Sequence, residues 1–187
     1  MTIKSIEVDF QTGPVPAAPS VSEIALEAGV TEAQAAAFIA AAYEQAETFT
    51  GRCYRGITAG EVLIEVDELT EWRWPRYPYP AAILSEVWSD ETRGWQARSV
   101  EYRAGWLMLY PGNLYRLTQS PTAPVDPLPS HVVQAVANLA LYQLVQLPQR
   151  REFKSQTQGD TTLSREALMG IFYGSGAGAL LASEVRK

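Results

Sequence analysis

The spacing of apolar residues changes along the chain and predicts two kinds of element. Between residues 32 and 50 it has the three- and four-residue repeat of one helix face, a stripe made of Ala35, Phe38, Ile39, Ala42, Ala46 and Phe49. From 58 to 118 the pattern becomes short runs rich in β-branched and aromatic residues, which is typical of an antiparallel sheet. The segment 130–147 is apolar nearly all round, so it predicts a helix that is central or pressed between subunits.

Capping residues set the ends of the predicted helices. Each start offers a Ser or Thr as N-cap, and two starts carry the three-residue spacing of a capping box. Each end meets a glycine or a proline. The expected helices span 20–28, 32–50 and 130–147, with caps and stops at Ser20, Glu23, Gly29, Thr31, Gln34, Gly51, Ser130 and Pro148.

The region 58–118 contains five strand candidates, EVLIEV, ILSEVWS, SVEYR, WLMLY and LYRLT. The proline-punctuated segment WRWPRYPYP, residues 72–80, interrupts them. Because proline cannot donate a hydrogen bond to a central ladder, we expect this segment at a sheet edge. The sequence therefore predicts one small antiparallel sheet of four to six strands, inserted into a helical domain.

The two ends of the chain differ from the middle. Residues 1–19 hold three prolines among small residues and predict an extended arm. Residues 149–162 are mostly polar, and 163–187 carry two short apolar clusters joined by glycines. Such a tail has too little apolar surface to fold alone, so we expect it to order on a partner. The predicted fold is α+β: an arm, a core at 20–148 made of a small three-helix bundle with an inserted sheet, and a loop with an extended helical tail at 149–187.

Composition and charge narrow the class of protein. A chain of 187 residues, 47% hydrophobic and 19% charged, buries one sizeable core. No apolar run reaches the roughly 18 residues that span a bilayer, and the start lacks a secretory pattern, so we expect an intracellular product without membrane segments. The net charge of −6 argues against a protein that grips nucleic acid, although residues 129–187, with 6 basic and 4 acidic side chains, are net positive.

Few residues suggest catalysis or metal binding. Cys53 is the only cysteine and His131 the only histidine, which excludes an intrachain disulfide and a histidine-cluster metal site. We expect Cys53 to be a small buried residue and His131 a structural one. The sequence predicts no enzyme and no cofactor; a hydrolase using Asp126 and His131 is the least favoured alternative.

Two further motifs have ordinary explanations. GSGAG, residues 174–178, lacks the following lysine and preceding strand of a phosphate loop, so we interpret it as a hinge. An acidic group lacks the EF-hand order and predicts a solvated strand edge. Its members are Glu65, Asp67, Glu68 and Glu71.

The aromatic segment 72–79 offers a second class of function. Its four large aromatic side chains form a possible stacking platform for a glycan or another ligand, in a tail-associated binding module. Packing in the core and at a sheet edge is the competing interpretation. The residues are Trp72, Trp74, Tyr77 and Tyr79.

The order of the parts resembles a known family. A helix ending in EQAETFTGRCY, a β segment with WPRYPYP leading to ILSEVWS, the helix SHVVQAVANLALYQLVQLP, the loop SQTQGDTTLS and the terminal LLASEVRK resemble the head-to-tail connector, or adaptor, proteins of tailed phages and of gene transfer agents. The resemblance runs from about Ser20. It implies a structural virion protein of the neck, made in the host cytoplasm, that forms a ring of about twelve copies under the portal and extends the DNA channel.

The implied partners are the portal protein ring, a tail or head-closure (stopper) protein, and other copies of the chain. DNA is expected to pass through the channel without sequence-specific binding. The resemblance implies portal docking by the tail, with candidates Leu163, Leu168, Ile171, Phe172, Leu180, Leu181, Val185 and Arg186, on a tether that includes Arg150, Arg151 and Lys154. A closed ring needs two different contact surfaces on each subunit, and the apolar helices supply candidates at Phe38, Ala42, Val133, Leu141 and Leu144. The smallest family members are almost wholly helical, so the segment 58–118 and the N-terminal arm have no assigned role.

Overall fold

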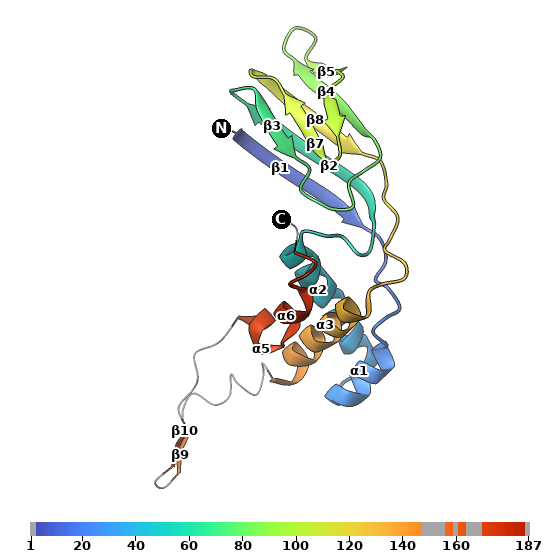
Figure 1. Ribbon diagram of the computed structural model, residues 1–187, viewed down its shortest axis with the longest axis vertical. Helices are drawn as coiled ribbons and strands as arrows, with labels where there is room; N and C mark the ends of the chain where they lie inside the picture. Colours follow the sequence, from blue (N-terminus) through green and yellow to red (C-terminus); the bar gives the residue numbers. More distant parts are fainter. Residues whose placement is uncertain (1–2, 147–155, 159–160, 164–169, 186–187) are drawn as a thin grey trace. The chain divides into compact units, whose positions relative to one another are not determined.

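The computed structural model describes residues 3–146, 156–158, 161–163 and 170–185. It divides the chain into two compact units (Figure 1). The sheet unit comprises residues 1–14 and 51–126, and the helical unit comprises 15–50 and 127–187. The chain therefore passes between the units three times, so each unit combines segments that are far apart in sequence.

Two antiparallel sheets form the sheet unit. The larger has the strand order β1-β2-β8-β4-β5, with β1 (Ile3–Thr12), β2 (Ile57–Val66), β8 (Asn113–Gln119), β4 (Ile83–Ser89) and β5 (Gly94–Ala97). The smaller has the order β3-β7-β6, with β3 (Thr70–Arg73), β7 (Trp106–Leu109) and β6 (Glu101–Arg103). One hydrophobic core takes side chains from both sheets, among them Val62, Ile64, Trp72, Trp74, Leu107 and Leu117.

The two-residue period of β2 explains which of its faces is buried. Val62, Ile64 and Val66 are completely buried, whereas Glu61 lies on the outer face. The register pairs Ile6 of β1 with Ile64 and Val8 with Val62, so β1 adds its own apolar residues to the inner face. The acidic positions of the larger sheet therefore lie on the face away from the core.

The helical unit consists of short helices around a small core. Its elements are α1 (Val21–Ala28), α2 (Glu32–Thr50), α3 (Ser130–Leu141), the π-helical turn η1 (Tyr142–Gln146), α5 (Ile171–Gly174), α6 (Ala177–Leu181) and a hairpin of β9 (Gln156–Gln158) and β10 (Thr161–Leu163). Helix α3 contacts α1, α2 and α6 (Figure 1). Completely buried alanines on α2 and α3, such as Ala35, Ala46 and Ala135, allow the backbones to approach closely.

The first two helices begin as their capping boxes predict. The Ser20 hydroxyl accepts from the Glu23 backbone N–H at 3.4 Å. Thr31 and Gln34 bond reciprocally, at 3.3 Å and 3.1 Å. At the third helix the prediction was wrong: Pro129 is the N-cap and no side chain caps it. Since the Pro129 carbonyl already accepts from the N–H groups of Val132 and Val133, the helix starts without the Ser130 hydroxyl.

Three predictions about larger parts differ from the structure. The expected N-terminal arm contains a ten-residue strand, β1, because Ile6, Val8 and Phe10 alternate toward the core face. The expected single sheet is two sheets, because the tight turn after β2 sends β3 into a separate ladder with β7. The C-terminal segment was expected to order on a partner, but part of it packs within the chain: α6 contacts α3, and Ala177 and Leu181 are completely buried.

No single helix among the described residues has the length and apolar composition needed to cross a bilayer. Within the described residues, α1 and α2 taken together reach that composition, and this pair is bent by 110°.

Candidate assembly surfaces

The residues first considered for catalysis have structural environments. The Nε2 atom of His131 lies 3.0 Å from Oε1 of Glu184, which joins the start of α3 to the turn after α6. Cys53 is buried, and its thiol donates to the Gly56 carbonyl at 3.3 Å. Within the described residues no group of three or more His, Cys, Asp or Glu side chains is placed to hold a metal ion. His131 and Cys53 thus each have a defined contact within their own unit.

The aromatic segment 72–79 is mostly core. Trp74 is completely buried, its indole N–H donates to Oε1 of Gln119 at 2.9 Å, and Trp72 is 6% exposed. These two side chains cannot form a stacking platform, because a ligand has no access to either indole face. Tyr77 and Tyr79 form an edge-to-face pair with ring centroids 5.4 Å apart, and Tyr77 is partly exposed.

A different tryptophan, which the sequence reasoning missed, is accessible. Trp106 on β7 is 41% exposed and lies beside a hollow of about 250 Å³ on the smaller sheet. The guanidinium of Arg73 lies 5.4 Å from the Trp106 ring and its Nε donates to the Tyr79 hydroxyl at 2.8 Å. The hollow is lined by Glu71, Glu101, Arg103, Trp106, Leu107 and Met108. The one sequence signal for Trp106 is the two-residue alternation of WLML, which places its side chain on the face opposite to that of Leu107 and Leu109.

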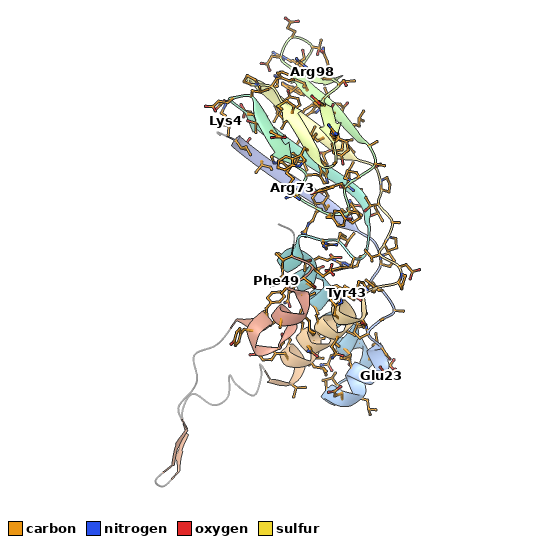
Figure 2. The ribbon with its side chains drawn as sticks, viewed as in Figure 1. Lys4, Glu23, Tyr43, Phe49, Arg73 and Arg98 are labelled. Atoms are coloured by element: carbon orange, nitrogen blue, oxygen red, sulfur yellow. The ribbon has the colours of Figure 1, made fainter. Side chains whose placement is uncertain are left out.

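The helical unit carries a mainly apolar groove between α2 and α5. It has a volume of about 430 Å³ and is lined by Ala41, Glu44, Gln45, Thr48, Phe49 and Phe172. The rings of Phe49 and Phe172 are stacked with centroids 4.4 Å apart, yet Phe49 remains 39% exposed. Phe49 is labelled in Figure 2. Next to them Tyr173 is 73% exposed. A large apolar side chain left open beside a groove is typical of a surface that another protein covers.

The structure separates the portal-docking candidates into three groups. Ile171, Phe172 and Leu180 are half-buried and Val185 is exposed. Leu181 is completely buried against the unit's own helices, so it belongs to the core, contrary to its assignment as a docking residue. Leu163 lies on β10, and Leu168 and Arg186, with the tether residues Arg150, Arg151 and Lys154, lie outside the described residues.

The subunit-interface candidates divide in the same way. Phe38, Val133, Leu141 and Leu144 are half-buried and so present part of their surface. Ala42 is completely buried on α2, which makes it a packing residue of the unit rather than a contact with another copy. The helix repeat identified the apolar stripe correctly but could not distinguish the face against α3 from the face toward solvent.

Two described groups of the sheet unit have a shifted pKa. The hydrogen bond from Lys4 to Glu65, at 2.7 Å, raises the pKa of the lysine. Burial raises the pKa of Tyr102, whose hydroxyl donates to the Pro80 carbonyl at 2.7 Å. Both shifts accompany structural contacts, and neither produces a reactive group.

Comparison with known proteins gives a match by fold. No family model matches the chain, and no curated protein matches it. Among solved structures, a chain described as the neck of an empty GTA particle with C6 symmetry matches with a TM-score of 0.59 at 16% identity, covering 97% of this chain and 96% of that one. The neck of a native GTA particle with C12 symmetry matches with 0.53 at 16% identity over the same shares. A virion of a native gene transfer agent (GTA) particle matches with 0.52 at 18% identity, covering 96% and 95%. The chain therefore has the fold of these particle chains along nearly its whole length.

Proposed function

We propose that this chain is a structural protein of the neck of a phage-like particle, an adaptor that forms a ring under the portal and carries the DNA channel toward the tail. The observation that carries the proposal is the end-to-end fold match to neck chains in particles of C6 and C12 symmetry. Coverage of 97% means that both units, and not a common submotif, find counterparts. A closed ring of identical copies requires each to present two different surfaces.

The charge of the chain suits a channel wall. With 21 acidic and 15 basic side chains, the body repels the phosphates that pass it. A protein that held DNA by its backbone would need the opposite balance. The adaptor thus guides DNA without reading its sequence, and the neck location and the absence of catalysis follow from the same role.

The groove surface of the helical unit is the proposed contact with the portal. Tyr173 and Val185 are exposed near the end of the chain, and the Phe49–Phe172 stack lies between α2 and α5. We retain as docking candidates Leu163, Leu168, Ile171, Phe172, Leu180, Val185 and Arg186, add Tyr173, and omit the buried Leu181. Phe38, Val133, Leu141 and Leu144 remain candidates for contact between copies.

Native mass spectrometry of the full-length chain mixed with the portal ring of its own particle tests this role. The wild type should load about one copy per portal subunit. The variant Tyr173→Ser/Val185→Ser should lose loading, whereas Leu26→Ser, at an 86% exposed site on α1, should retain it. If the wild type never binds the portal ring, the adaptor role is wrong. If the double variant loads like the wild type, the docking surface lies elsewhere and the role stands.

A ligand-binding module is a second candidate, now centred on Trp106. An exposed indole beside two carboxylates and an arginine has the components of a sugar site, and the hollow of about 250 Å³ accommodates a small ligand. Binding to a glycan array that disappears in Trp106→Ala but persists in Trp88→Ala, another partly exposed tryptophan of the sheet unit, would favour it. No binding by the wild type would remove it.

A further inference from the structure

The larger sheet ends in two open edges. In the order β1-β2-β8-β4-β5, strands β1 and β5 each have a hydrogen-bonded neighbour on one side only within the described sheet. Strand β1 is ten residues long, so its open edge is a long row of backbone donors and acceptors. Open edges of this kind pair with other chains unless they are covered or guarded.

The β1 edge is incompletely covered on its inner face. Ile6 and Val8 point to the side of the buried Ile64 and Val62, yet they are 44% and 47% exposed. Phe10, farther along the same face, packs against the core and lies 6.0 Å from the Trp74 ring. The middle of β1 therefore overhangs the core, and a strand added beside it would bury Ile6 and Val8.

The β1 edge is acidic. Glu7 and Asp9 are exposed on its outer face, and Glu61 of β2 lies opposite Asp9. The strand has one basic residue, Lys4, and its ammonium binds Glu65 at 2.7 Å. Glu7 and Asp9 thus dominate the charge that an approaching strand would meet.

The β5 edge has the opposite charge. Arg93 directly precedes the strand and Arg98 directly follows it, and both are exposed. The segment from Arg93 to Arg98 contains no acidic residue, although the preceding turn holds Asp90 and Glu91, and Asp90 accepts from the Trp88 indole at 3.0 Å. In Figure 2, Lys4 and Arg98 mark the β1 and β5 sides of the sheet.

We infer that the β1 edge of one copy pairs with the β5 edge of the next, so that the larger sheets run on from copy to copy. This inference rests on the proposed ring. Contact between two different edges is heterologous, which is the kind of contact that closes into a ring. The pairing brings the acidic edge of one copy toward the arginines that flank β5 in the next, and it covers Ile6 and Val8. The contact therefore needs no residue of the helical unit.

Charge reversal tests whether Glu7 and Asp9 promote pairing of the β1 edge or prevent it. If Glu7 and Asp9 only guard the edge against aggregation, reversing them leaves ring formation unchanged. If they pair with the arginines of the next copy, Glu7→Arg/Asp9→Arg puts four positive charges together and blocks the ring. Adding Arg93→Glu/Arg98→Glu to the same chain restores opposite charges and should restore the ring.

The experiment measures loading of the full-length chain on the portal ring by native mass spectrometry, at about 50 mM salt. Glu7→Arg/Asp9→Arg and Arg93→Glu/Arg98→Glu should each lower the fraction of complete rings at least tenfold, and the four-residue swap should recover most of it. Glu27→Arg/Asp126→Arg, with the same charge change at exposed sites that belong to neither edge strand, is the control and should load normally. Circular dichroism of each variant checks its folding.

The outcomes separate the two proposals. Full rings from both single-edge reversals overturn the edge pairing and leave the adaptor role intact. If the four-residue swap folds but forms no rings, the pairing is also overturned, because restoring opposite charges at the two edges then does not restore the ring. A wild type that never loads the portal overturns both.

Discussion

Trp74 provides a test of the core at the scale of one residue. Replacement by Phe keeps most of the apolar surface but leaves the buried Gln119 oxygen without its donor, which costs about 1–3 kcal/mol of unfolding free energy. Trp106→Phe, at a 41% exposed site, should change it by less than about 0.5 kcal/mol. Urea unfolding measures both. Equal effects would contradict the assignment of Trp74 to the core and Trp106 to the surface.

The Phe49–Phe172 stack joins two residues that are 123 positions apart (172 − 49). We expect a double-mutant cycle with Phe49→Ala and Phe172→Ala to give a coupling free energy of about 0.5–1.5 kcal/mol, as aromatic pairs do. Urea unfolding of the four proteins provides the values. A coupling indistinguishable from zero would mean that the rings do not stack in solution.

Contacts between residues that are far apart in the sequence could not be predicted from it. Glu184 contacts His131, which is 53 positions away in the sequence. The Tyr43 hydroxyl donates to the carbonyl of Ala18, and the two residues are 25 positions apart. Only local contacts followed from spacing, as with Thr31 and Gln34, because there the chain itself fixes the geometry.

At the scale of elements, α6 is predicted to stabilise the helical unit rather than serve only as a docking clamp. Leu181→Ala should cost about 2–5 kcal/mol, the range for removing a buried leucine side chain. Leu26→Ala, at an 86% exposed site, should cost less than about 0.5 kcal/mol. The check is urea unfolding with hydrogen exchange of α3, which should lose protection in the first variant. If Leu181→Ala unfolds like the wild type, the tail does not pack on α3.

The elements also show where sequence patterns suffice. Helix α2 has the predicted bounds, Glu32–Thr50, and ILSEVWS is strand β4, Ile83–Ser89, because propensity, spacing and breakers agree there. Strand β1 went unrecognised although Ile6, Val8 and Phe10 alternate, since the prolines after it suggested an arm. Strand β5, GWQA, has almost no strand signal of its own and depends on its partner, with Trp95 opposite Trp88.

At the scale of the molecule, the acidic charge predicts weak contact with DNA. We expect no mobility shift of a long duplex by micromolar full-length chain at about 150 mM salt, because the net charge of −6 opposes phosphate binding. As a control, Glu7→Arg/Asp9→Arg/Glu61→Arg replaces three exposed acidic residues by basic ones. This variant should shift the mobility of the duplex more than the wild type does. Tight binding by the wild type would argue against a channel wall that DNA slides past.

The division into two units did not follow from the sequence. The insertion of a sheet between the second and third helices was expected, but β1 also joins that sheet from before the first helix. Its pairing with β2 links residues that are at least 45 positions apart, and no local pattern encodes that choice.

The central claim is that this chain is a structural component of a particle neck, and electron cryo-microscopy of the particles encoded with it tests that claim most directly. We predict a ring of density between head and tail into which the sheet unit and the helical unit fit, each once per subunit. Particles whose complete neck is accounted for by other chains, with this one absent, would contradict the account.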